Sequence, residues 1–196
     1  NGEVVDGEEI LFIIAQWRLK HGLVNGTVVG TLMSNMGLEH GLKRLGVDFK
    51  RAKVGDRYVM ELLNQGGWKL GGESSGHIIC LDRTTTGDGI ISALQVLQAM
   101  IESERGLHEL KAGMTKYPQC LVNVRISRRI DMRDTPAEVH QAVESAEHQL
   151  QERGRVLLRP SGTEPLIRVM VEGEAAQEVE QIANEIADVV KKSYAT

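Results

Sequence analysis

The sequence has few aromatic residues, few cysteines and no long apolar run, and each shortage excludes a class of protein. Aromatic residues make up 4% of the 196 residues. The only two cysteines, Cys80 and Cys120, are 40 residues apart and make neither a disulfide framework nor a metal knuckle. We therefore expect a reducing, cytoplasmic environment. The longest apolar stretch, residues 10–15, is much shorter than the roughly 20 residues of a membrane span, so no membrane partner is expected.

An excess of positive charge is missing as well. Lys and Arg number 23 against 27 Asp and Glu, a net charge of −4. Binding to nucleic acid needs a broad positive field, so we expect no nucleic-acid partner, although one focused phosphate site is still compatible with this balance. The G-x-x-x-x-G-K-[ST] and G-x-G-x-x-G nucleotide-binding patterns are also missing.

Glycine, in contrast, is abundant. It accounts for 21 residues, or about 11%, against an average near 7%. So many glycines with so few aromatics indicate tight functional loops between ordinary helices and strands. The chain opens on Asn1 and Gly2, a turn dipeptide, and has no initiating methionine. From this we expect a piece of a longer protein.

The first part of the sequence alternates between helical and strand patterns. Helices are predicted over residues 6–22, 36–45 and 56–65 (the last capped by Asp56), and strands over 27–33, 47–54 and 77–81. A longer helix is expected after Asp88, and its face includes Ile90, Leu94, Leu97 and Ile101. This alternation predicts a layered α/β domain with a mixed sheet over residues 1–110, followed by a linker at 111–117.

The pattern restarts after the predicted linker. Strands are predicted over 120–126, 155–158 and 166–171, and a capping box at 135–138, with Pro136 as first helical residue, opens a helix. The final helix carries apolar residues at helical spacing: Val179, Ile182, Ala183, Ile186 and Val190. The order β-α-β-β-α over residues 118–196 predicts a small α+β domain with both helices on one face of its sheet.

One loop between two predicted strands, residues 159–165, is richer in polar groups than a turn requires. Arg159 offers a planar fork of donors, Ser161 and Thr163 offer hydroxyls, and Gly162 allows close approach of backbone N–H groups. Arg168 follows on the next strand. These groups suit a phosphate monoester, which carries about −1.5 to −2 charges and three acceptor oxygens. A hydroxyl-rich turn with a solvated arginine is the alternative.

A second loop, residues 71–77, contains the pattern G-x-S-x-G, with Ser74 in the position of a hydrolase nucleophile. That interpretation requires a helix after the serine, and a strand pattern follows instead. The remaining functional interpretation is a polar clamp in which Glu73, Ser75 and His77 bind sugar hydroxyls and His77 can move a proton. A glycine hairpin remains an equally good alternative from these residues alone.

Other polar segments have simpler explanations. Residues 87–89 contain one carboxylate, too few for a hard cation, and indicate a helix cap instead. Residues 53–57 are charged and best interpreted as the solvated start of a helix. No metal ligands are predicted in this chain.

Taken together, the two loops resemble those of the α-D-phosphohexomutase family. Residues 72–77 resemble its G-E-x-S-G-H sugar-binding loop, and residues 159–165 resemble its R-x-S-G-T-E-P phosphate-binding loop, in the same order. Residues 31–39 and 84–89 resemble the bacterial phosphoglucosamine mutase branch of that family more than the phosphomannomutase/phosphoglucomutase branch. The resemblance extends over essentially the whole chain.

Members of the family that this chain resembles have four domains. The first carries a phosphoserine loop and the second a D-G-D-G-D-R loop that binds Mg²⁺, and both motifs are missing here. The chain thus resembles the third and fourth domains only, so the Mg²⁺ ligands and the catalytic serine would lie in the absent N-terminal domains, its expected partners. Within this chain, Glu73, Ser75 and His77 would bind the sugar, and Arg159, Ser161, Gly162, Thr163 and Arg168 would bind the phosphate.

The implied activity is the interconversion of glucosamine 6-phosphate and glucosamine 1-phosphate by way of an enzyme phosphoserine and a bisphosphate, a step that feeds amino-sugar nucleotide and cell-wall synthesis. We expect this chain to be inactive alone. The alternatives are a phosphomannomutase/phosphoglucomutase of the same family and a stand-alone module that binds sugar phosphates.

Overall fold

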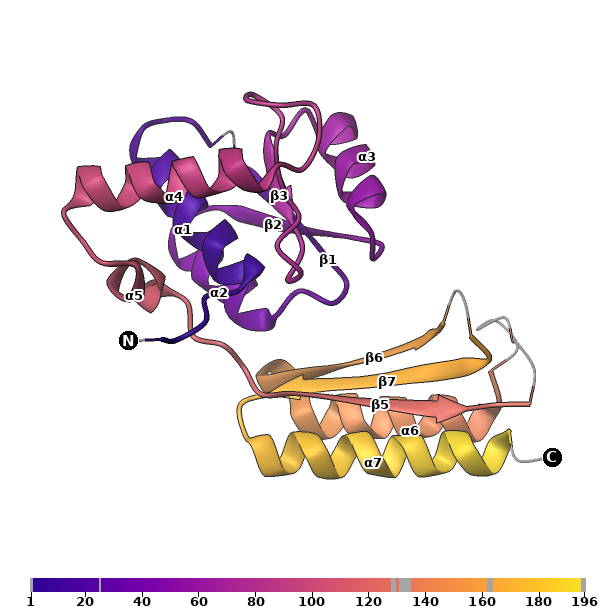
Figure 1. Cartoon of the computed structure of the whole chain (residues 1–196). Coiled ribbons are helices and arrows are strands. Elements are labelled where there is room, and N and C mark those ends of the chain that lie inside the picture. Colours follow the sequence, from indigo (N-terminus) through magenta and orange to yellow (C-terminus); the bar gives the residue numbers. More distant parts are fainter. Residues whose placement is uncertain (1, 25, 128–129, 131–134, 162–163, 195–196) are drawn as a thin grey trace. The chain divides into compact units, whose positions relative to one another are not determined.

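The computed structural model describes residues 2–24, 26–127, 130, 135–161 and 164–194. The chain divides into two compact units, residues 1–116 and 117–196 (Figure 1). Most of the predicted linker, residues 111–117, differs from the prediction because it belongs to the first unit. Residues 111–113 form a 3₁₀ turn, and Met114 is 7% exposed in the core beside helix α1 (Gly7–Lys20). No helix in the described ranges is long and apolar enough to cross a membrane.

The first unit is a layered α/β domain with a mixed sheet, which confirms the predicted fold class. Its elements are α1 (Gly7–Lys20), β1 (Thr27–Thr31), α2 (Met36–Arg44), β2 (Asp48–Ala52), α3 (Asp56–Gly66), β3 (Leu70–Gly72), β4 (Ile78–Cys80), α4 (Gly89–Ser103) and α5 (Leu107–Leu110). The strands lie in the order β2-β1-β3-β4. Strand β1 is parallel to β2 and β3, and β4 is antiparallel to β3.

Successive residues of a strand point to opposite faces, and this alternation builds the two sides of the first core. Val28 packs with apolar residues of α1 and α2 on one face. Val29 packs with Val59 and Leu63 of α3 on the other. Helix α1 is apolar on most of its circumference because it also packs against α4 and α5 on the side away from the sheet.

The second unit is the predicted β-α-β-β-α arrangement. It contains β5 (Gln119–Arg125), α6 (Ala137–Leu150), β6 (Gly154–Pro160), β7 (Leu166–Gly173) and α7 (Ala176–Ser193). Strand β7 lies between β5 and β6 and is antiparallel to both. Both helices cover one face of this sheet, and Val179, Ile182, Ile186 and Val190 are each 2% exposed or less (Figure 1).

Three local predictions differ from the structure. Asp56 is the first residue of α3 and does not cap it, because Gly55 at φ 125° occupies the N-cap position. Pro136 is the N-cap of α6, so the helix begins one residue later than predicted. Strand β3 was expected as part of a glycine loop. Its three residues are buried, all three pair with β4 and the first two also pair with β1, so sheet formation outweighs the low strand propensity of glycine.

A fourth difference concerns helix α4. Asp88 caps it as predicted, since its Oδ1 accepts hydrogen bonds from the backbone N–H groups of Ile90 and Ile91. The apolar face that the spacing predicts, however, is exposed. Ile90 and Ile101 are each 75% exposed, Leu94 57% and Leu97 51%. The inward face instead carries Ser92, Gln95 and Ala99.

Candidate functional site

The loop with the G-E-x-S-G-H pattern follows the carboxyl end of β3. Because β1, β2 and β3 are parallel, residues 32–35 and 53–55 emerge at the same edge of the sheet. In open α/β sheets, ligands bind outside the carboxyl ends of the strands where the strand order reverses. The order β2-β1-β3 reverses between β1 and β3, so the fold brings this loop to the edge where ligands bind.

The backbone of this loop is a tight turn pinned against the start of α1. Gly76, at φ 96°, donates its N–H to the carbonyl of Glu73 at 3.0 Å, and Glu73 donates its own to the carbonyl of His77 at 3.1 Å. Gly7 donates to the carbonyl of Ser74 at 3.2 Å. A Cβ atom at Gly7 would lie 2.3 Å from the carbonyl oxygen of Glu73, so this close approach requires glycine.

The side chains that we predicted to bind sugar lie together on this turn. Ser75 Oγ and His77 Nδ1 are 3.3 Å apart and both residues are exposed. Glu73 Oε1 accepts a hydrogen bond from the backbone N–H of Gly55 at 2.9 Å. Residues 53–57 are therefore joined to the loop by this contact, a proximity that the sequence did not indicate. No helix follows Ser74, as predicted, and the nucleophile-elbow geometry is therefore not formed.

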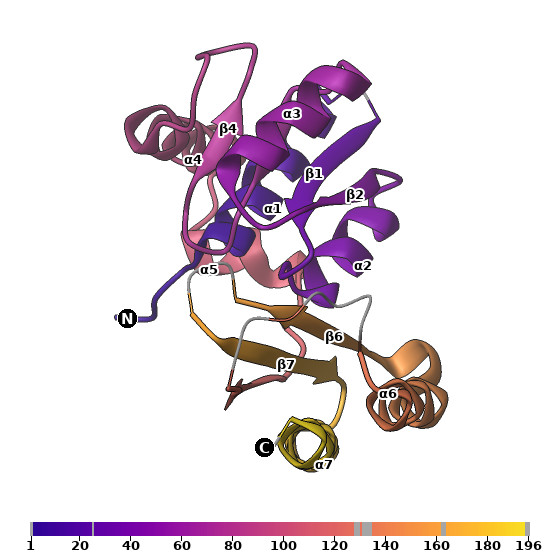
Figure 2. The ribbon, with the colours of Figure 1, turned by 90° about the vertical axis from the view of Figure 1, so that its right-hand side faces the viewer.

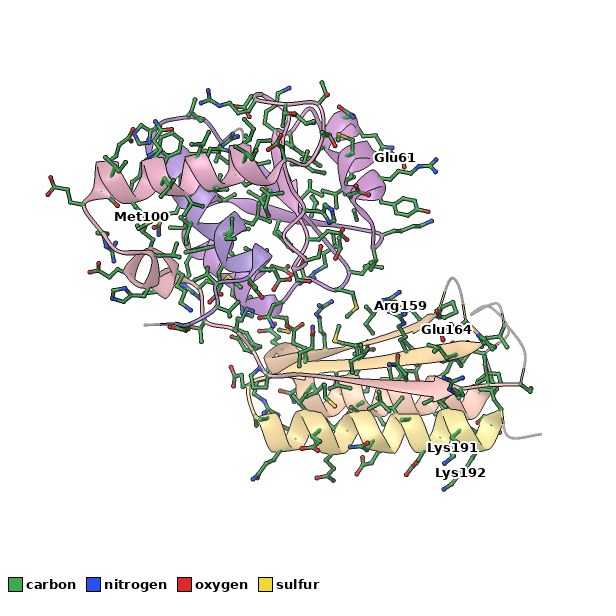
Figure 3. All side chains as sticks on the ribbon, viewed as in Figure 1. Glu61, Met100, Arg159, Glu164, Lys191 and Lys192 are labelled. Atoms are coloured by element: carbon green, nitrogen blue, oxygen red, sulfur yellow. The ribbon has the colours of Figure 1, made fainter. Side chains whose placement is uncertain are left out.

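The second loop joins β6 and β7. Ser161, 7% exposed, donates its backbone N–H to the carbonyl of Leu166 at 2.9 Å, and its Oγ accepts from the N–H of Glu164 at 3.3 Å. Figure 3 shows Glu164 in this loop, beyond Arg159 at the end of β6. The predicted phosphate-binding residues Gly162 and Thr163 lie outside the described residues.

Two arginines sit opposite one another beside this loop. Arg159 on β6 pairs in register with Arg168 on β7, so both side chains project from the sheet face opposite α6 and α7. The Nε atom of each is buried and has no hydrogen-bond partner among the described residues. Burial, and then the nearby charge of Arg168, lower the pKa of Arg159 below its usual range. Two cations placed this close together, each with an unpartnered donor, have the charge and geometry that suit an anion.

A third residue lies in the same cross-strand row as Arg159 and Arg168, and the sequence did not indicate it. Asn123 on β5 pairs in register with Arg168, which places an amide beside the two guanidinium groups. Only the strand register, set by residues far apart in the chain, could have identified it. Arg155, four residues before Arg159 on β6, differs from it because the Arg155 Nε donates to the buried carboxylate of Glu172 at 2.7 Å.

Two family models match the chain. Phosphoglucomutase/phosphomannomutase, alpha/beta/alpha domain III, matches residues 6–117, and the Phosphoglucomutase/phosphomannomutase C-terminal domain matches residues 121–189. Among curated relatives, a phosphoglucosamine mutase of Alkalilimnicola ehrlichii is 61% identical over 100% of this chain and 43% of its own length. One of Nitrosococcus oceani is 57% identical over 96% of this chain and 42% of its own length.

The fold has solved counterparts. The N-acetylphosphoglucosamine mutase of Aspergillus fumigatus, in complex with GlcNAc-6P and magnesium, is similar with a TM-score of 0.80 over 98% of this chain and 45% of its own, at 20% identity. The present chain spans about two fifths of the length of these curated relatives. On these matches, the chain belongs to the phosphoglucomutase/phosphomannomutase family, and it corresponds to that family's third and C-terminal domains.

Proposed function

We propose that this chain is the sugar- and phosphate-binding half of a phosphoglucosamine mutase, which interconverts glucosamine 6-phosphate and glucosamine 1-phosphate. The relatives at 57% and 61% identity bear that name, and the chain spans 42–43% of their length. The first unit would bind the sugar and the second the phosphate. In this assignment the product supplies amino-sugar nucleotide and cell-wall synthesis.

The observation that carries the proposal is the arginine pair of the second unit. Arg159 and Arg168 are adjacent, and among the described residues neither forms an ion pair. Two like charges that are partly removed from water repel one another unless an anion compensates them. A phosphate monoester provides that charge and matches the planar fork of arginine. Ser161, with Gly162 and Thr163 by family resemblance, would complete the phosphate grip.

The loop of the first unit fits a neutral, hydroxyl-rich ring. Glu73 can accept hydrogen bonds from sugar hydroxyls, and the Ser75 hydroxyl can both donate and accept. His77 directs Nδ1 toward Ser75, which leaves Nε2 to exchange a proton with a sugar hydroxyl. With one set of residues that binds the sugar ring and another that binds a phosphate, the same side chains would bind both substrate orientations.

In this mechanism, phosphoryl transfer begins outside the chain. A phosphoserine in the preceding domains donates its phosphoryl group to the sugar monophosphate, and the resulting bisphosphate turns over and returns the other phosphate to the serine. The residues of this chain contribute positioning. Arg159 and Arg168 hold the phosphate that is not being transferred, while Glu73 and Ser75 orient the ring.

Magnesium would belong to the full-length enzyme. The similar structure from Aspergillus fumigatus contains magnesium together with GlcNAc-6P. In the described part of the present chain, no group of three or more His, Cys, Asp or Glu side chains could hold a metal ion. These residues therefore do not fit the ion, and no step that we assign to this chain involves it.

The test is calorimetric titration of the chain with glucosamine 6-phosphate, with glucosamine as the ligand that lacks phosphate. Each charge-assisted hydrogen bond contributes about 1.5–3 kcal/mol, so Arg159→Gln should weaken binding about 10- to 100-fold. Glucosamine, which cannot use the pair, should bind the variant and the natural chain equally.

Arg153→Gln is the matched control. It removes the same charge from the residue just before β6, where Arg153 forms an exposed ion pair with Glu178. Position 153 is six residues from Arg159, about 20 Å along an extended strand. Equal affinity of the natural chain, Arg153→Gln and Arg159→Gln for glucosamine 6-phosphate would contradict the assignment of the arginine pair.

A further inference from the structure

Helix α4 is oriented with its polar side inward. The most buried residues on the face that packs on the first unit are Ser92, Gln95 and Ala99, each 5% exposed or less, and the partly buried Val96 and Met100 pack beside them. The outer face carries four large apolar side chains, 51–75% exposed: Ile90, Leu94, Leu97 and Ile101. A contiguous apolar surface of this kind on a folded protein marks an interaction site.

The outer face has the geometry of a helix-packing seam. Its four apolar residues follow one another at intervals of four, three and four residues, the spacing at which one helix presents a continuous ridge to a neighbour. The helix contains no charged residue before Glu102, so no charge interrupts the ridge. Figure 2 shows α4 at the edge of the first unit, where no other element of that unit covers its outer side.

The ridge continues into an apolar groove. This groove, of about 520 Å³, lies between α4 and the residues that precede and begin α1, and its lining includes Val5, Ile10, Val96, Leu97 and Met100. Leu97 belongs to both the ridge and the groove. Figure 3 shows Met100 on the same helix. The N-terminal segment of the chain therefore runs along the apolar surface that α4 exposes.

We propose that the outer face of α4 and this groove form the docking surface for the domain that precedes domain III in longer members of the family. This proposal rests in part on the proposed function, because it takes the rest of a phosphoglucosamine mutase as the partner. The relatives contain more than half of their length outside the matched region, and the matched models are domain III and the C-terminal domain.

The position of the groove favours this occupant over a second copy of the chain. Glu3 and Val5 line the groove, so a domain joined to residue 1 would be held beside the ridge at high effective concentration. A stable dimer buries about 800 Å² on each partner, whereas the apolar surface here is limited to one side of one helix and one groove. A tethered domain needs less area, because the connection has already restricted its position.

The experiment compares the 196-residue chain with a fusion. The fusion joins the part of the Alkalilimnicola ehrlichii enzyme that precedes the matched region to residue 1 of this chain. Both carry Cys120→Ser and one new cysteine, Leu94→Cys or Ile101→Cys on the ridge, or Glu61→Cys on the exposed side of α3 as the control. We expect maleimide to label positions 94 and 101 at least tenfold more slowly in the fusion, and position 61 at the same rate in both proteins.

Mutase activity of the fusion separates the two proposals. An active fusion with unprotected positions 94 and 101 would overturn the docking surface and leave the proposed function intact. Protection without activity on glucosamine 6-phosphate would leave the docking surface and overturn the proposed function. If the fusion does not fold, cysteines at the aligned positions of the intact Alkalilimnicola ehrlichii enzyme give the same test. Protection in the 196-residue chain alone, with a dimer in sedimentation, would assign the surface to a second copy.

Discussion

Helices α4 and α7 have the same kind of apolar spacing but opposite relations to the interior of their units. In α7, the residues Val179, Ile182, Ile186 and Val190 are buried against the second sheet. In α4, the equivalent ridge faces outward and a polar stripe faces inward. The comparison teaches that hydrophobic periodicity identifies a helix and its apolar side, but does not say which neighbour covers that side.

The reason for the difference lies in helix α1. Arg18 is completely buried, and its Nε and Nη2 donate to Gln95 Oε1 at 2.9 and 2.6 Å. Its Nη1 lies 2.9 Å from Asp82 Oδ1. A buried charge requires such partners, so α4 must turn its amide inward. Its apolar residues are then left on the outside.

The largest expected effect contrasts the two apolar faces directly. Ile186→Ala in α7 removes buried methylene groups and should lower the free energy of unfolding of the second unit by about 2–5 kcal/mol. Leu94→Ala in α4 should change that of the first unit by no more than about 0.5 kcal/mol, because Leu94 is already exposed. Urea titrations followed by the amide NMR signals of β7 and β1 report the two units separately. Equal losses would mean that the faces do not differ.

An intermediate effect is expected on the inner face of α4. Gln95→Leu removes the acceptor of two hydrogen bonds from the Arg18 guanidinium and should destabilise the first unit by about 2–3 kcal/mol. Gln98→Leu is the control, because Gln98 lies on the same helix but is exposed. It should change the free energy of unfolding by no more than about 0.5 kcal/mol. Urea unfolding followed by the fluorescence of Trp17 and Trp68, both in the first unit, measures the difference. A stabilising Gln95→Leu would show that the polar face is not required.

The smallest effect concerns pH. Cys80 Sγ accepts from Gln95 Nε2 at 3.0 Å, and burial raises the pKa of this thiol, an effect that the Gln95 hydrogen bond partly offsets. The folded state thus holds the proton more tightly than the unfolded state. The contribution of this proton to the free energy of unfolding is fully present below the unfolded-state thiol pKa of about 8.5. It is lost as pH rises toward the higher pKa of the folded state.

Cys80→Ala tests this pH dependence. Urea titrations between pH 7 and 10 should show that the free energy of unfolding declines above about pH 8.5. The slope of this decline should be shallower in Cys80→Ala than in the natural chain, and the two slopes should differ by less than about 1.4 kcal/mol per pH unit. The matched variant Cys120→Ala keeps the Cys80 thiol, so any change in slope that it causes belongs to the second unit. Identical slopes for the natural chain and Cys80→Ala would contradict the assignment.

The two candidate loops show how far local sequence carried the site. The motif at residues 72–77 predicted which polar side chains would gather on one turn, because they are separated by at most four residues. The phosphate loop was predicted only in part. Arg159 and Arg168 are nine residues apart, and their pairing across β6 and β7 follows from a short connection. Asn123 joined them through pairing with a strand more than 40 residues away in sequence, which no local pattern records.

By itself, the sequence determined the order of helices and strands, the two folded units and the composition of both loops, because periodicity, caps and turn residues act over a few neighbouring positions. Tertiary structure alone decided the register that places Asn123, Arg168 and Arg159 in one row, the contact between Glu73 and Gly55, and the outward face of α4. Each of these depends on groups brought together from distant parts of the chain, where the need to satisfy buried charges and hydrogen bonds outweighs local preference.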